Sequence, residues 1–228
     1  GFLESMWKVV EPAIDFVVDM QTERGEIIWA RHSDGTLWSY ALLTGSSSIA
    51  HSIRSAIKIA TELGFEKKRW ESSYVKLANV IQTVPEAFAP KKRWAMDWYY
   101  PVLTGVVTDE MGKKHLAEMN ETFEIQGKGI RCVSDRPWIT TAETCECAMA
   151  FQSIGDTQHA LELFKQVQNL RNEQGQYLTG MVYPESVSFP EDEYSTYSAA
   201  AVVLAADSLI GVTEASQLFS NHKFLPVL

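Results

Sequence analysis

The sequence predicts an all-α protein, an α/α-hairpin toroid of the (α/α)6 type with about four hairpins present. Two observations predict this fold. Amphipathic segments alternate with segments that are almost wholly small and apolar, and a helix that is apolar all round must be buried on all sides. The apolar segments also recur at roughly 50-residue intervals, a spacing that indicates stacked helical units; they begin near Ser46, Asp97, Thr141 and Tyr197. The loops that enter these apolar helices then open on one face, where we expect the functional site.

Each predicted hairpin pairs an amphipathic outer helix with an apolar inner helix. The outer helices are expected over residues 4–22, 67–84, 109–123 and 156–172. The inner helices are expected over residues 46–64, 97–105, 139–154 and 194–209, with a last helical turn at 213–219.

Residues with known terminal preferences set these boundaries. Ser46, Ser47 and Ser48 suit the N-cap of the first inner helix, and Gly64 suits the position after its last turn. Asp156 suits the N-cap of the fourth outer helix. Pro12 either kinks the first outer helix or marks its start.

No linker interrupts the chain, so residues 1–228 are predicted to form a single domain. A closed ring of this type normally needs six hairpins, and four are expected here. Either hairpins are missing on the N-terminal side, or the chain forms a homo-oligomer. The start at Gly1, without an initiator Met, favours the first alternative.

Composition excludes several classes of protein. A net charge of −9 argues against a nucleic-acid partner, which would require a basic face. No run of about 18 apolar residues predicts a membrane span, and no signal peptide is visible. Three cysteines are few and odd in number, which favours reduced thiols and a cytoplasmic location.

Several blocks of the sequence resemble a bacterial family labelled "prenyltransferase" by similarity. Residues 21–29, with Gln21, Gly25 and Trp29, resemble the QxxxG…W turn of squalene cyclase and protein prenyltransferase toroids, and 175–177 echoes it loosely. The other matching blocks are 43–49, 96–101, 131–138 and 142–146. The resemblance implies a toroid of which this chain looks like the C-terminal part, and an isoprenoid-handling activity.

Other blocks resemble the six-hairpin glycosidase-like enzymes, which share this toroid. Residues 2–7 and 14–17 resemble an outer helix of glucoamylase-like enzymes, and 195–200 resembles their closing inner helix. This resemblance implies an enzyme of carbohydrate metabolism whose catalytic carboxylate lies in the loop before that last helix, where Glu185 is found.

Aromatic and basic side chains gather in the predicted loops and at the starts of inner helices. They either plug the wide end of the helical ring or bind a flat or apolar ligand, such as a sugar ring or an isoprenoid. The candidate substrate-binding residues are Trp29, Trp38, His51, Arg54, Trp98, Tyr99, Arg131, Arg136, Trp138 and Tyr183.

Carboxylates on the same rim supply candidates for catalysis. Glu143 and Glu146 interrupt an otherwise apolar helix, and a buried Glu is rare unless it is paired. Glu143 is either a working acid or ligand contact, or a capping carboxylate, or a partner of Arg131 or Arg136. Glycoside hydrolysis needs two carboxyl groups, one protonated and one ionised. The candidate catalytic residues are Glu143, Asp97, Glu185 and Asp135.

Three functions remain open from the sequence. They are glycan hydrolysis or binding by paired carboxylates, isoprenoid chemistry, and a non-catalytic binding module. No metal is expected, because Cys145 and Cys147 lie on different helix faces and no Asp, Cys and His spacing suits zinc. No cofactor is expected either, because no glycine-rich phosphate loop occurs.

Overall fold

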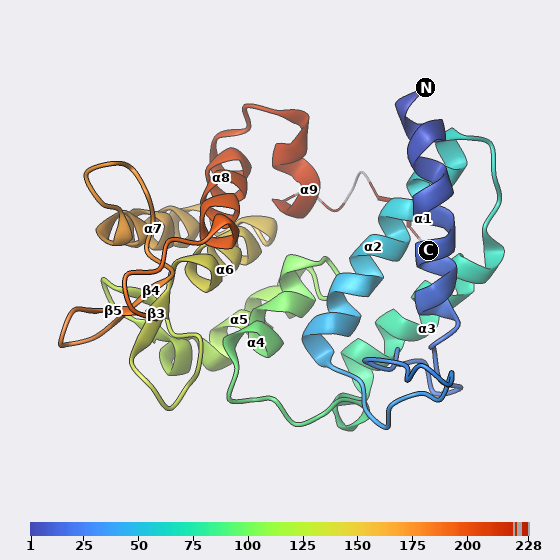
Figure 1. Cartoon of the computed structure of the whole chain (residues 1–228), viewed down its shortest axis with the longest axis horizontal. Helices are drawn as coiled ribbons and strands as arrows, with labels where there is room; N and C mark the ends of the chain where they lie inside the picture. Colours follow the sequence, from blue (N-terminus) through green and yellow to red (C-terminus); the bar gives the residue numbers. More distant parts are fainter. Residues whose placement is uncertain (221, 223–224, 228) are drawn as a thin grey trace. The chain divides into compact units, whose positions relative to one another are not determined.

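The computed structural model describes residues 1–220, 222 and 225–227, and most of them are helical (Figure 1). The helices are α1 (Phe2–Val18), α2 (Leu43–Glu62), α3 (Lys68–Thr83), α4 (Ala95–Leu103), α5 (Asp109–Phe123), α6 (Thr141–Ser153), α7 (Thr157–Val167), α8 (Thr196–Ile210) and α9 (Gln217–Ser220). Short 3-10 helices are η1 (Pro85–Ala87), η2 (Gln168–Leu170) and η3 (Glu214–Ser216).

The predicted alternation of outer and inner helices is confirmed. The four inner helices are α2, α4, α6 and α8, and each begins within three residues of its predicted start. Asp156 caps α7 by accepting a hydrogen bond from the amide of His159. Pro12 lies inside α1, which runs through it.

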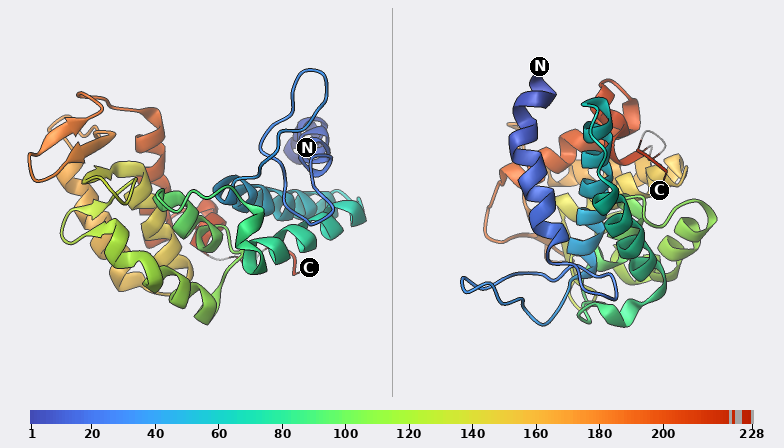
Figure 2. Two further views of the ribbon diagram at one scale, coloured as in Figure 1. Left: turned by 90° about the horizontal axis from the view of Figure 1, so that it is seen from below. Right: turned by 90° about the vertical axis from the view of Figure 1, so that its right-hand side faces the viewer.

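The chain groups into two compact units, which are described separately. The first unit holds residues 1–91 and the described residues after 222. Its helices α1, α2 and α3 pack against one another around Trp7, Trp70 and Leu77. The indole of Trp70 donates to Asp15 at 2.8 Å, which fixes α3 against α1. The 23–42 loop extends away from these three helices in both views of Figure 2.

The second unit, residues 92–222, is built around α6. Helices α4, α7 and α8 all pack on α6, so nearly every α6 residue is buried. Its core includes Tyr99, Phe123, Leu163 and Ala205. The inner helix α8 differs from the prediction of complete burial, because Val203 and Ile210 on one face are 67% and 69% exposed.

Three outer helices end in the same short hairpin, a repeat that the sequence pattern only suggested. Pairs of residues six positions apart bridge in antiparallel fashion after α1, α5 and η2; they are Gln21–Ile27, Glu124–Ile130 and Arg171–Tyr177. Each hairpin is also closed by one backbone hydrogen bond just outside the bridged pair. The amides of Ile28, Arg131 and Leu178 donate to the carbonyls of Met20, Phe123 and Leu170, respectively. After α3 the chain instead enters η1 at Pro85.

The QxxxG turn is the first of these hairpins. The side-chain amide of Gln21 donates to the carbonyl of Gly25 at 2.8 Å and to that of Ser73 on α3 at 2.9 Å. Gly25 has φ +123°, and a Cβ there would lie 2.8 Å from the carbonyl oxygen of Lys76. The motif therefore packs the turn against α3: Gln21 binds two backbone carbonyls, and Gly25 lets the turn approach the backbone of α3 closely.

Short strands occur in the loops, which the helical pattern did not predict. Strands β1 (Glu124–Ile125) and β2 (Gly129–Ile130) form the hairpin after α5. Strands β3 (Trp138–Thr140), β4 (Gly180–Val182) and β5 (Val187–Phe189) form an antiparallel sheet in that order. This sheet connects the loop before α6 with the loop before α8, and so it positions the starts of both inner helices (Figure 1).

No single helix in the described ranges is long and apolar enough to cross a membrane. Helix α8 and the η3–α9 segment reach that criterion only together, and they are bent by 95°.

Candidate active site

The N-terminus of α6 is held by backbone contacts on two sides. Strand β3 runs directly into α6, and Thr141 donates its amide to Thr179 and its hydroxyl to Leu178. On the other side, the hydroxyl of Thr144 accepts the amide of Ile130 from β2 at 3.0 Å. Gly129 is required there, because a Cβ at Gly129 would lie 2.8 Å from the Thr144 hydroxyl.

Glu146 lies in the second turn of α6 and accepts hydrogen bonds from three tyrosines. Tyr99 on α4 donates to Oε2 at 2.5 Å, and Tyr100 donates to Oε1 at 3.1 Å. Tyr197, near the start of α8, donates to Oε1 at 2.7 Å. Glu146 is only 8% exposed. Burial raises the pKa of Glu146, and the three phenol hydrogen bonds oppose that rise.

Glu143 precedes Glu146 by three residues, so the two side chains share a face of α6. Glu143 is partly exposed, and its Oε2 accepts a hydrogen bond from the hydroxyl of Thr140. Burial raises the pKa of the Glu143 carboxyl, while the bond from Thr140 opposes the rise. A carboxyl group with a raised pKa and access to solvent can serve as a general acid.

Among the described residues, neither glutamate forms an ion pair with a basic side chain. The two arginines of the preceding loop lie elsewhere: Arg131 donates to the carbonyl of Ser134 at 3.3 Å, and Arg136 is exposed. The two carboxyl groups are therefore held by hydroxyl groups instead of by cations.

A short segment around Cys132 connects the starts of α4 and α6. The carbonyl of Cys132 accepts the amide of Ala95, the first residue of α4, and its amide donates to Trp138 in β3. Burial, together with the nearby charge of Glu143, raises the pKa of the Cys132 thiol to about 12. Asp97 lies in the first turn of α4, two residues after Ala95.

The other predicted carboxylates are Asp135 and Glu185, and neither is hydrogen-bonded to the three tyrosines that bind Glu146. Asp135 is exposed and accepts a hydrogen bond from Arg93 at 2.8 Å. Glu185 is exposed in the turn between β4 and β5. Because Thr140 pairs with Gly180 at the near end of β4, the chain runs away from the start of α6 as it approaches Glu185.

The predicted aromatic residues of this unit fall into two groups. Trp98 is buried, stacks on Phe123 at 5.4 Å and packs α4 on α5, while Tyr99 serves Glu146. Trp138 is partly exposed and stacks on Phe189 at 4.6 Å across the sheet. Tyr183 lies under the ammonium group of Lys128, 4.8 Å from the ring centre.

Four predicted site residues belong to the first unit; they are Trp29, Trp38, His51 and Arg54. Trp29 is 51% exposed, and Trp38 stacks on His32 at 5.7 Å. His51 and Arg54 are buried in α2, and Arg54 donates to the carbonyl of Pro226 and lies over the ring of Tyr74.

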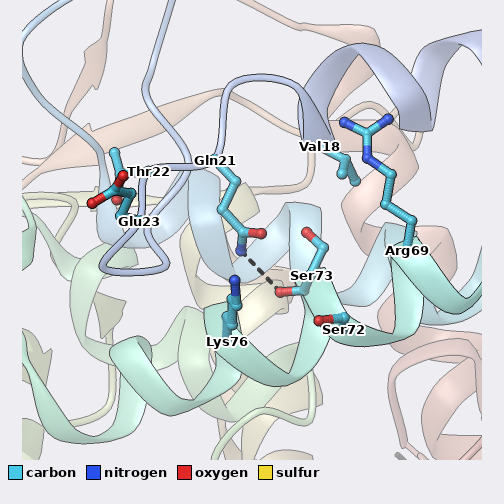
Figure 3. Close-up of a pocket in the computed structure, with 8 residues that line it drawn as sticks. All are labelled: Val18, Gln21, Thr22, Glu23, Arg69, Ser72, Ser73 and Lys76. Carbon is cyan, nitrogen blue, oxygen red and sulfur yellow. Dashed lines mark hydrogen bonds between the residues drawn. The ribbon is translucent and has the colours of Figure 1, made fainter.

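A solvent-open depression of about 360 Å3 lies between the end of α1 and α3 (Figure 3). It is lined by Val18, Gln21, Thr22, Glu23, Arg69, Ser72, Ser73 and Lys76. None of the residues predicted for the site lines it. Its polar lining includes the Gln21 amide that binds Ser73, and Arg69 forms ion pairs with Asp15 on α1 and with Asp19 just after it.

The structure adds Glu146, Tyr100 and Tyr197 to the predicted candidates. Glu146 was visible in the sequence as a second carboxyl group within an apolar helix, without an assigned role. The two tyrosines carried no signal, because they are 46 and 51 residues from Glu146 along the chain.

Among the described residues, no three or more His, Cys, Asp or Glu side chains are grouped so that they could hold a metal ion. The cysteines Cys132, Cys145 and Cys147 are buried and form no disulfide.

Comparisons with known proteins found one similar sequence and one similar structure. The chain matches no model of a known protein family. Over 218 residues it is 46% identical to the MMP endo-(1,4)-3-O-methyl-alpha-D-mannosidase of Mycolicibacterium hassiacum. The match covers 96% of this chain and 60% of that relative, so the chain spans less than two thirds of its length.

A solved structure has a similar fold. It is an inactive variant of the alpha-1,6-mannanase GH76A of Salegentibacter sp. HEL1_6 in complex with alpha-1,6-mannotetrose. The TM-score is 0.67 at 12% sequence identity, and the match covers 93% of this chain and 66% of that one. The chain therefore has the α/α-toroid fold that its sequence predicted.

Proposed function

We propose that this chain belongs to a glycoside hydrolase that cleaves α-mannosidic bonds inside an oligosaccharide. The observation that carries the proposal is the 46% identity to an endomannosidase over 96% of the chain. Glu143, partly exposed and free of a cationic partner among the described residues, supplies an acid of the kind that the reaction needs.

The proposed substrate follows from the relative's name. It is an oligosaccharide of α-(1→4)-linked 3-O-methylmannose, a sugar whose methyl groups give one face an apolar character. The stacked pair of Trp138 and Phe189, beside the start of α6, offers a matching apolar surface.

In this proposal Glu143 donates its proton to the glycosidic oxygen as the bond from that oxygen to the anomeric carbon breaks. A water molecule adds to the anomeric carbon and loses its proton to a second carboxylate, so that atoms and charges balance. We assign the second role to Asp97, because it lies in the first turn of α4, whose first residue is hydrogen-bonded to the segment that leads into β3 and α6. Glu185 and Asp135 are the alternatives, and the contacts of the second unit favour them less.

Substitution of the proposed acid tests this function. Glu143→Gln removes the transferable proton and keeps the size of the side chain, so hydrolysis should fall by a factor of about 100 or more. The measurement is the release of shorter oligosaccharides from the methylated α-(1→4) substrate, and from alpha-1,6-mannotetrose as a second substrate, by chromatography with mass detection.

The matched control is Glu162→Gln on the outer helix α7, which should leave turnover unchanged. Circular dichroism checks that both variants stay folded. Full activity of Glu143→Gln would remove Glu143 from the mechanism, and binding of the sugar without any turnover by the unsubstituted chain would make it a binding module.

A further inference from the structure

We propose that Glu146 holds the negative charge of the Glu143–Glu146 pair, and that its three tyrosine donors thereby keep Glu143 protonated. Glu146 is then a positioning residue, since it acts on the reaction through Glu143. The mechanistic part of this inference rests on the proposed function. The assignment of the proton itself does not.

The first argument is the number of hydrogen bonds that each carboxyl group accepts. Glu146 accepts three phenol hydrogens, at 2.5, 2.7 and 3.1 Å, and Glu143 accepts one hydroxyl hydrogen from Thr140. Hydrogen bonds donated to a carboxylate stabilise its charged form. If Glu146 carried the proton, one phenol would have to turn and accept it.

The second argument is that the pair cannot comfortably ionise twice. The two carboxyl groups are three residues apart on one helix face, where two like charges disfavour each other. The charge of Glu143 is one of the causes that raise the pKa of Glu146. No cation from the described residues compensates them. One proton therefore stays with the pair as the pH rises through the ordinary pKa range of carboxyl groups. Glu143 retains this proton, because it accepts fewer hydrogen bonds than Glu146.

The phenol and thiol groups around the pair are neutral at neutral pH. Tyr99 and Tyr100 come from α4 and Tyr197 from α8, and burial raises the pKa of all three phenols. Burial also raises the pKa of the thiols of Cys132, Cys145 and Cys147. On α7, the hydrogen bond to Glu124 raises the pKa of His159, and its Nε2 lies 3.1 Å from Glu124, so this imidazole is paired with Glu124. None of these groups supplies a competing charge to the pair.

Two single variants decide which carboxyl group holds the proton more strongly. Carbon-13 NMR of the full chain, labelled at the side-chain carboxyl carbons of Glu, follows the remaining member of the pair in Glu143→Gln and in Glu146→Gln across a pH titration. We expect Glu143 in the Glu146→Gln variant to titrate at a higher pH than Glu146 in the Glu143→Gln variant. The reverse order would overturn the proposal.

Tyr197→Phe, added to Glu143→Gln, tests the role of the tyrosine donors. Tyr197 is 53% exposed, so loss of its hydroxyl should leave the fold intact. The titration of Glu146 should move to higher pH by about one unit, the worth of one hydrogen bond to the charged form. The matched control is Tyr177→Phe, whose hydroxyl binds Gln168. An unchanged Glu146 titration with Tyr197→Phe would also overturn the proposal.

Activity is a separate readout in the protein that keeps both glutamates. Tyr197→Phe should shift the acid limb of the kcat/KM profile to higher pH, because Glu146, which is ionised in the active pair, then loses its proton at a higher pH. If no mannoside is cleaved, the proposed function fails while the NMR result still stands. If cleavage occurs but the NMR order is reversed, the inference fails alone.

Discussion

Two glutamates on one face of α6 differ in their surroundings although they are three residues apart. Glu143 reaches the partly exposed end of the helix, and Glu146 is enclosed by three phenols. The apolar sequence around them marks both as unusual. It cannot rank them, because the donors to Glu146 come from α4 and α8, which reach α6 only through the packing of the second unit.

The raised pKa of Glu143 makes a prediction about stability. A folded-state pKa above the unfolded value means that the folded chain holds this proton more tightly. The resulting stability is present below the ordinary pKa of Glu and is lost as the pH rises through the folded-state pKa, by about 1.4 kcal/mol for each unit of the shift. Urea unfolding from pH 4 to pH 8 should therefore show wild type losing stability relative to Glu143→Gln.

Glu26 provides the control of opposite sign. Its hydrogen bonds from Arg24 lower the pKa of its carboxyl, so its contribution is present above the ordinary pKa and is lost as the pH falls. Wild type should accordingly lose stability relative to Glu26→Gln as the pH is lowered. Parallel pH curves for wild type and Glu143→Gln would contradict the environment described for Glu143.

The hairpins after the outer helices repeat one geometry with different chemistry. Gly25, Gly127 and Gly175 all have positive φ in these hairpins, yet only Gly25 is pressed against another helix. A Cβ at Gly127 would meet nothing within 4 Å, and one at Gly175 would meet only the flexible end of Arg171. The QxxxG motif is thus a packing device between α1 and α3, and it carries no information about the ligand.

Substitution of Gly25 should therefore lower the free energy of unfolding more than substitution of Gly35, which also has a positive φ but no neighbouring atoms. Gly25→Ala combines an unfavourable φ with a Cβ 2.8 Å from the carbonyl oxygen of Lys76 and should lower the free energy of unfolding by about 3 kcal/mol. Gly35→Ala, at φ +90° with nothing within 4 Å, should cost about 1 kcal/mol. Equal losses in thermal or urea unfolding would show that the contact with α3 is unimportant.

At the scale of the whole molecule, the chain divides into two units that each bury their own core. The first unit packs α1, α2 and α3 around Trp70, and the second packs α4, α7 and α8 around α6. Elements with separate cores can open separately, since local unfolding follows contiguous groups of contacts.

Hydrogen exchange with the Gly25→Ala variant tests this division. Faster exchange of backbone amides is expected in α1, α2 and α3, while amides of α6 and α7 should keep their wild-type protection. Mass spectrometry of peptic fragments measures both regions in one experiment. An equal loss of protection in α6 would mean that the two units unfold as one.

The sequence alone determined the class of fold and the succession of helices. Amphipathic and apolar segments alternate, and glycines, prolines and capping residues mark their ends, so local physics sufficed to place α5 at its observed bounds and α6 within two residues of them. It also identified Glu143 as an unusual group, since a charge within an apolar helix is costly wherever that helix is buried.

Only the tertiary structure decided what each polar residue does. In the folded chain Asp135 pairs with Arg93, and Arg54 donates to the carbonyl of Pro226. One carboxyl group, that of Glu146, accepts hydrogen bonds from Tyr99, Tyr100 and Tyr197. These partners are separated by 42 to 172 residues, and hydrogen bonds depend on distances of a few tenths of an ångström that no helical period encodes. The short strands of the loops, including the sheet that positions the start of α6, were likewise set by partners distant in the chain.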